Sequence, residues 1–161
     1  MINCTFENGK TADPGLRHIT VGALVYNEKG QVLLVKRSAK YSRPNTWTIP
    51  GGFLDRDREI TEAVLKELKE ETGMTGKVKE LFHINDYPNR PNEDRQNVDF
   101  IYLVNIESGS FHHDDEITNI QWFDKDSLPK EEEFAFDHRT TILKFYEWRE
   151  KPFPLPLLGK L

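Results

Sequence analysis

The chain has 161 residues, of which 37% are hydrophobic, and a formal net charge of −5 at pH 7. This size and composition predict one globular domain with a sizeable core, and the negative charge argues against broad binding to nucleic acid or to anionic membranes. No apolar run approaches the length of a membrane span, and the first ten residues lack a signal-peptide core. The single cysteine, Cys4, excludes an internal disulfide and fits a reducing, cytoplasmic compartment.

The N-terminal third is predicted to consist of an arm, a hairpin and a loop. Residues 1–17 are polar and punctuated by glycine and proline, so we expect an arm rather than a domain. The runs HITVGALVYN (18–27) and QVLLVKRS (31–38) are β-rich, and the connecting NEKG predicts a hairpin between them. Residues 41–59 contain two prolines and two adjacent glycines, which favour a loop.

A helix is predicted from Ile60 or Thr61 to Thr72, with Gly73 as its left-handed C-terminal cap. The remaining predicted elements are strands at 77–87, 97–107 and 116–124, a proline-bearing connection at 88–96, an amphipathic helix at 137–150, and a proline-broken apolar tail at 151–161. Strands and helices mix without strict alternation, which predicts a mixed sheet flanked by helices. We expect the tail to pack on the surface or against a second copy of the chain in a homodimer.

Three glutamates, Glu67, Glu70 and Glu71, project from one side of a single helical turn because they are spaced i, i+3, i+4. They continue the edge of the apolar stripe, where the helix meets the rest of the protein. Crowded carboxylates repel unless a cation neutralises them, and such oxygen ligands suit Mg²⁺ or Mn²⁺. A metal beside the preceding PGG loop would suit hydrolysis of a phosphoanhydride. The alternative is a solvated face that pairs with nearby lysines.

The complete stretch GGFLDRDREITEAVLKELKEETGM resembles the Nudix box, the loop–helix motif of the Nudix hydrolases. The positions that match in register are Gly52, Glu67, Leu68, Glu70, Glu71, Gly73 and Met74, and the upstream WTIPGG is also typical of the family. The resemblance implies an α/β/α sandwich with a mixed β-sheet between helices, formed by residues 18–150.

The motif departs from the family pattern around one charge pair. Arg58 stands where the family has a loop glutamate, and Lys66 stands where it has the arginine that commonly pairs with that glutamate. Asp57 replaces a frequent glycine. Because Arg58 and Lys66 repel each other, we expect Lys66 to pair with Glu59, Asp57 or its i−4 neighbour Glu62.

The resemblance also implies the roles of individual residues. Glu67, Glu70 and Glu71 are the expected metal ligands, with the backbone carbonyl of Gly51 as a further ligand. The expected general base is Glu71 or a glutamate from a later loop. Glu116 is the favoured residue of that loop, with Asp114 and Asp115 as competitors.

Several residues are candidates for substrate binding. Arg37, Arg90 and Arg95 are expected to bind phosphates, since guanidinium groups pair with phosphates bidentately. Trp47 and Tyr41 are candidates for stacking on a base, although Trp47 also fits a position beneath the loop. Relatives that act on ADP-ribose often carry a proline about sixteen residues beyond the motif, and Pro88 and Pro91 bracket that position. The segment FAFDH (134–138) is similar to segments of ADP-ribose hydrolases, whereas His112 and His113 lack a third ligand for zinc.

Three functional hypotheses follow from the resemblance. The favoured one is a Mg²⁺- or Mn²⁺-dependent hydrolase that converts ADP-ribose, a small-molecule nucleotide, to AMP and ribose 5-phosphate. The second is a pyrophosphohydrolase of oxidised nucleoside triphosphates. The third, from another class, is a sensor that binds a nucleotide without hydrolysing it. Retention of all three glutamates favours an enzyme.

Overall fold

The computed structural model describes residues 17–90 and 96–161. The strands are β1 (His18–Val25), β2 (Val32–Arg37), β3 (Trp47–Thr48), β4 (Gly51–Phe53), β5 (Met74–Asn85), β6 (Asn97–Gly109), β7 (Ile117–Phe123) and β8 (Leu157–Leu158). The helices are α1 (Ile60–Thr72) and α2 (His138–Glu150), with short 3-10 turns at Lys125–Ser127 and Glu131–Glu133. Within the described residues, none of the helices has the length and apolar character needed to cross a membrane.

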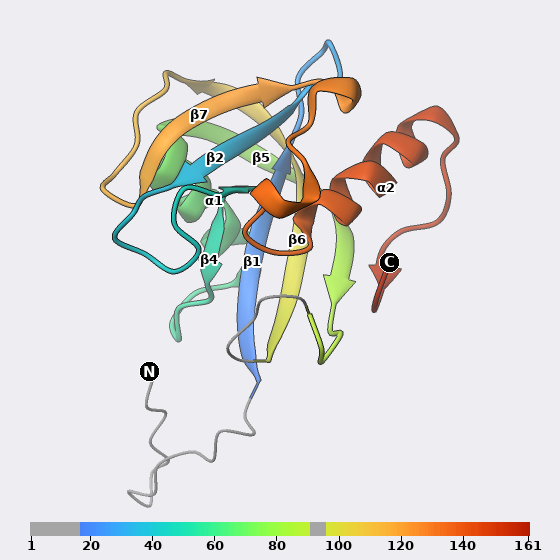
Figure 1. Cartoon of the computed structure of the whole chain (residues 1–161). Coiled ribbons are helices and arrows are strands. Elements are labelled where there is room, and N and C mark those ends of the chain that lie inside the picture. The colour runs from blue at the N-terminus through green and yellow to red at the C-terminus, as the bar shows by residue number, and fades with distance from the viewer. Residues whose placement is uncertain (1–16, 91–95) are drawn as a thin grey trace, which may run out of the picture.

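The strands form two sheets that lie between the two α-helices (Figure 1). The larger sheet has the order β4-β1-β6-β5-β8 and the smaller one the order β3-β2-β7. In the larger sheet β1 runs parallel to β6, whereas β4 is antiparallel to β1 and β5 is antiparallel to β6. The predicted α/β architecture, a mixed sheet between helices, is therefore confirmed.

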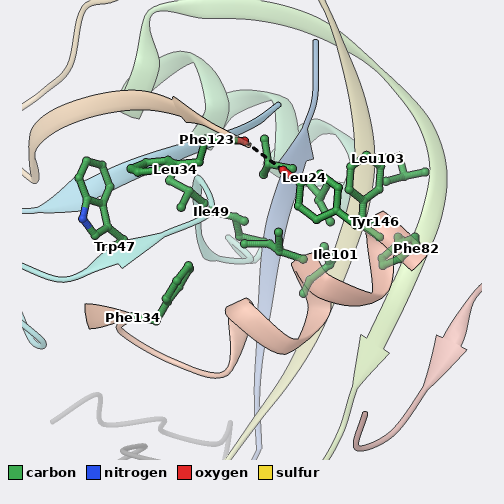
Figure 2. Packing of buried hydrophobic residues seen from close by; sticks show 13 residues of the cluster. Leu24, Leu34, Trp47, Ile49, Phe82, Ile101, Leu103, Phe123, Phe134 and Tyr146 are labelled. Atoms are coloured by element: carbon green, nitrogen blue, oxygen red, sulfur yellow. Dashed lines mark hydrogen bonds between the residues drawn. The ribbon is translucent and has the colours of Figure 1, made fainter. Parts of the chain in front are cut away.

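The hydrophobic core has one layer on each face of the larger sheet. Ala63, Val64 and Leu68 of α1 pack on one face, and α2 packs on the other through residues such as Phe145. Strand β1 contributes alternate residues to both layers, which explains its nearly continuous apolar sequence. Figure 2 shows the α2 layer, where the Tyr146 hydroxyl donates a hydrogen bond of 3.0 Å to the Phe123 carbonyl.

The prediction for α1 and its cap is confirmed. Gly73 has φ 73°, and its N–H donates to the carbonyl of Lys69. An added Cβ at this position would lie 2.4 Å from the Ser110 carbonyl oxygen, so glycine is needed for space as well as for conformation. The cap turns the chain directly into β5, which begins at Met74 rather than at the predicted Lys77.

The predicted hairpin is only partly correct. Its turn forms, with the Gly30 N–H donating to the Asn27 carbonyl, but β1 and β2 join different sheets and meet at a single bridge between Tyr26 and Val32. Local turn residues fix the turn, whereas the partners of each strand are fixed by distant segments.

The prediction that residues 41–59 form a continuous loop is also wrong. This segment contains β3, which pairs with β2, and β4, which pairs with β1. Pro50 separates the two short strands, and β4 lies at the edge of its sheet. Because these pairings are long-range, the glycine and proline content alone does not reveal them.

The tail returns to the larger sheet of the same chain. Strand β8 pairs in parallel with β5, and the His83 ring contacts the Gly159 carbonyl through Nε2 at 2.8 Å. The Gly159 N–H in turn donates to the Ile84 carbonyl. These bonds attach the end of the tail beside the C-terminal half of β5, as the red and light-green strands of Figure 1 show.

Candidate active site

The acidic turn of α1 packs beside β4, the edge strand of the larger sheet. Val64 and Leu68 are fully buried and fix the rotation of the helix on the sheet. The three glutamates consequently differ in exposure. Glu71 is 4% exposed, and the side chains of Glu67 and Glu70 are 16% and 49% exposed. The carboxylates thus run from the protein interior to the surface along one turn.

The Glu71 carboxylate lies against the backbone of Gly51, whose N–H donates to Oε2 at 2.9 Å. Burial raises the pKa of the Glu71 carboxyl well above its usual value, and the negative charge of Glu67 raises it further. The hydrogen bond from Gly51 and the charge of Arg37 oppose this shift without cancelling it. The positive charge near the buried carboxylate is therefore too small to offset the effect of burial on its pKa.

Gly52 allows the Glu67 carboxylate to approach the loop closely. A Cβ at this position would lie 2.8 Å from the carboxylate carbon, closer than such contacts allow. Burial also raises the pKa of Glu67, although the neighbouring Lys66 opposes the shift. Two partly or fully buried acids are thus placed against the backbone of consecutive glycines.

Lys66 pairs with acids that were not expected from the sequence. Its Nζ lies 2.7 Å from Oε2 of Glu70, 3.3 Å from Oε1 of Glu67 and 3.9 Å from Oδ2 of Asp55. The prediction of Glu59, Asp57 or Glu62 as its partner is wrong. The lysine side chain reaches forward to its i+4 neighbour and to the loop, which the sequence spacing alone did not distinguish from the i−4 direction.

Arg58 forms an exposed ion pair with Asp55, with 3.1 Å between Nε and Oδ2. Exposed pairs of this kind contribute less than about 1 kcal/mol. Changing Arg58 to Glu should therefore alter turnover at saturating metal by less than about threefold, which steady-state kinetics would measure. A large gain in turnover would contradict this expectation and show that Arg58 impairs the site.

The donor set fits a hard divalent cation in its chemistry. Glu67 and Glu71 offer carboxylate oxygens, and burial raises the pKa of both. Within the described residues, no three Asp, Glu, His or Cys side chains converge closely enough to hold one ion. The Glu70 carboxylate instead contacts Lys66. His112 and His113 are exposed.

The loop before β7 brings further acids near this turn. The Glu116 carbonyl accepts a hydrogen bond from the Ser38 N–H, which joins the loop to the end of β2. Burial and the charge of Glu70 raise the pKa of Glu67, and the charge of Glu116 adds to this shift. The charge of Asp114 likewise contributes to the raised pKa of Glu71. Asp115 differs, because it forms an exposed pair with Lys40.

A cavity of about 380 Å³ borders the Gly51–Gly52 backbone. It is lined by Thr20, Val21, Arg37, Ser42, Arg43, Thr48, Ile49, Gly51, Gly52, Phe53, Arg90, Asn97, Asp99, Phe136 and His138. The two glycines therefore contribute to the wall of the cavity and also contact the acids of α1. This shared backbone joins the cavity and the carboxylates into one site.

A buried carboxylate, Asp99, forms part of the cavity wall. It accepts hydrogen bonds from Thr20 at 3.1 Å and from His138 Nε2 at 3.2 Å, and Arg90 lies 3.5 Å away. Burial alone would raise the pKa of Asp99, but these partners outweigh it and lower the pKa. Asp99 therefore remains ionised inside the protein.

The position of Arg90 in the structure differs from the one expected for a phosphate ligand. Its side chain is 3% exposed, and its Nη2 lies 2.7 Å from Oδ1 of Asp137, which also accepts from Nε. The guanidinium charge is thus balanced by Asp137 and Asp99. This arrangement favours a structural ion pair over a phosphate contact. Arg95 and Pro91 lie outside the described residues.

Of the other predicted substrate-binding residues that the structure describes, Arg37 alone lines the cavity. Its guanidinium lies over the Phe136 ring at 5.9 Å, and its Nε donates to the Ser42 carbonyl. Trp47 is instead 8% exposed and packs edge-on against Phe123 in the core, so its position does not support stacking on a base. Tyr41 is exposed outside the cavity lining.

The FAFDH segment divides between the core and the cavity, with Phe134 buried and Phe136 on the cavity wall. Sequence reasoning missed several lining residues: Thr20, Ser42, Arg43, Phe53, Asn97 and Asp99. One signal was available. Asp99 alternates with Ile101 on the core-facing side of β6, and a polar residue in such a position needs a buried partner.

Comparisons with known proteins agree with the fold and the motif. A model of the NUDIX domain matches residues 16–145. An ADP-ribose pyrophosphatase of Methanocaldococcus jannaschii is 29% identical over 125 residues, covering 78% of this chain and 71% of that protein.

Two solved structures share the fold. A NUDIX hydrolase from Nitrosomonas europaea has a TM-score of 0.79 at 19% identity, covering 99% of this chain and 86% of that one. An ADP-ribose pyrophosphatase from Streptococcus suis has a TM-score of 0.69 at 21% identity, covering 90% of this chain and 100% of that one. With the domain model matching most of its length, the chain belongs to the Nudix family, whose hydrolases act on pyrophosphate bonds and typically use divalent metals.

Proposed function

We propose that this Nudix hydrolase cleaves ADP-ribose to AMP and ribose 5-phosphate with the help of Mg²⁺ or Mn²⁺. The observation that carries the proposal is the cavity whose wall at Gly51 and Gly52 also contacts Glu71 and Glu67. Its volume of about 380 Å³ falls in the range of small-molecule sites. The names of the relatives from M. jannaschii and S. suis support ADP-ribose in particular.

The cavity offers groups that suit both parts of such a substrate. The Arg37 guanidinium lies over the Phe136 ring, and burial lowers its pKa, while the negative charges of Glu71 and Glu116 oppose that shift. That position suits a guanidinium that contacts the diphosphate. Phe136 and the exposed Phe53 supply aromatic surface for the base or sugar.

The acids of α1 would hold the metal. Glu67, Glu70 and Glu71 are the proposed ligands, together with the Gly51 carbonyl. When bound, Mg²⁺ or Mn²⁺ neutralises phosphate charge and lowers the pKa of the attacking water. The residues of the chain position the diphosphate at the glycine wall and keep the carboxylates beside it.

Two glutamates are proposed for the general base. Glu71 is buried and its pKa is raised toward the operating pH, which favours proton transfer. Glu116 is exposed on the loop before β7, within electrostatic range of Glu67 and Arg37. Either would accept a proton from the water that attacks the diphosphate.

A substrate panel with Mg²⁺ and with Mn²⁺ tests the proposal. We expect ADP-ribose and water to give AMP and ribose 5-phosphate, measured by chromatography of the products. The panel should include nucleoside triphosphates, with oxidised bases among them, because these are the substrates of the second hypothesis. Pyrophosphate released from a triphosphate while ADP-ribose stays intact would overturn the choice of substrate. Binding without any turnover would instead support a sensor.

A further inference from the structure

Lys66 occupies a distinctive place among the acids of α1. Its ammonium group contacts Glu70 at 2.7 Å and Glu67 at 3.3 Å, and Asp55 lies 3.9 Å away. The lysine side chain is 28% exposed, so its charge is only partly screened by water. Two of the three glutamates proposed as metal ligands are therefore already bound to a cation that belongs to the chain itself.

The same oxygen atoms cannot serve the ammonium group and a divalent ion equally well. A metal that takes Oε1 of Glu67 or Oε2 of Glu70 replaces the hydrogen bond that Lys66 makes there. The metal and the ammonium also repel each other at such short range. Lys66 has Asp55 as an alternative partner, because that carboxylate lies close on the loop side.

We propose that Lys66 is a built-in counter-cation of the acidic cluster, which divalent metal must displace from Glu67 and Glu70. It stabilises the metal-free protein and weakens metal binding. This accounts for the direction of the Glu70 carboxylate, which contacts Lys66. The inference rests on the proposed function only for the choice of ion and of its ligands, and it makes no use of the substrate.

The test is the Kd of Mn²⁺ measured by calorimetry or electron paramagnetic resonance without substrate. Lys66→Met keeps the length of the side chain and removes its charge, and we expect Mn²⁺ to bind roughly three- to fivefold more tightly, the scale of such ion pairs. Lys69→Met is the matched control. It removes the same charge from the same helix, but its Nζ contacts the Gly73 carbonyl, so the Kd should change less than about twofold. Lys66→Arg, which keeps the charge, should stay near the wild-type Kd.

A second measurement uses the wild-type protein and does not depend on how a variant folds. The rate at which an amine-acetylating reagent modifies Lys66, read by mass spectrometry, should rise when Mn²⁺ is added, whereas the rate at Lys69 should not. An unchanged or weaker Mn²⁺ affinity in folded Lys66→Met, or an unchanged acetylation rate at Lys66, would overturn the proposal. Because neither readout involves hydrolysis, an inactive protein that shows both effects would retract the substrate assignment and keep this inference.

Discussion

Replacing Glu71 with Gln should lower turnover at least ~10²-fold, which is the scale expected when a site loses a metal ligand or an acid–base group. The substitution keeps the size of the side chain, and the amide oxygen can still accept the hydrogen bond from the Gly51 N–H. Only the charge and the basic oxygen are lost. The kcat and KM for ADP-ribose, or for the best substrate of the panel, are the quantities to measure.

The same variant should leave the metal-free fold at least as stable as the wild type. A carboxyl whose pKa is raised in the folded state favours the neutral form, so its contribution to stability is lost as the pH rises and recovered as the pH falls. Gln mimics that neutral form at every pH. The free energy of unfolding of Glu71→Gln should therefore equal or exceed that of the wild type at pH 8.

Glu62→Gln is the matched control, because Glu62 is an exposed glutamate on the same helix. It should leave turnover nearly unchanged. Wild-type kinetics in Glu71→Gln would remove Glu71 from the site. A large loss of stability in that variant would instead show that the Glu71 charge supports the fold, contrary to the effect of its burial.

Changing Asp137 to Ala should lower the free energy of unfolding by about 3 kcal/mol, the lower end of the cost of breaking a buried ion pair. Asp137 accepts hydrogen bonds from both Nε and Nη2 of Arg90, and a further one of 2.7 Å from Asn85. Without it, the guanidinium stays buried and loses its closest printed ion pair, while the Asp99 carboxylate remains 3.5 Å away. Urea denaturation of the metal-free protein at pH 7 measures the effect.

The pH dependence gives this prediction a second readout. Burial alone would raise the pKa of Asp137, but the hydrogen bonds and charge of Arg90 outweigh it and lower the pKa. Such a group stabilises the fold above its unfolded pKa, and the contribution is lost as the pH falls through the folded value. The difference in the free energy of unfolding between Asp137→Ala and the wild type should thus have its full size at pH 7 and shrink below about pH 4.

Asp126→Ala provides the comparison, since Asp126 is exposed on a short 3-10 turn. The free energy of unfolding of this variant should stay within about 0.5 kcal/mol of the wild-type value. If Asp137→Ala were equally mild, Arg90 would not depend on Asp137 for its charge balance. The guanidinium would then be available to contact a phosphate, as the sequence analysis expected.

The sequence by itself determined the features that depend on neighbours within a few residues. The 3.6-residue period and Gly73 fixed α1 and its cap, and the i, i+3, i+4 spacing placed Glu67, Glu70 and Glu71 on one turn. The run of matches from Gly52 to Met74 then indicated the family and, with it, the fold.

Only the tertiary structure decided which distant groups meet. The pairing of β4 with β1 brought the two glycines of the expected loop against Glu71 and Glu67. The approach of Asp137 to Arg90 placed an expected phosphate ligand in a buried ion pair. Neither contact can be deduced from local spacing, because each joins segments at least fifteen residues apart whose approach depends on how sheets and helices pack.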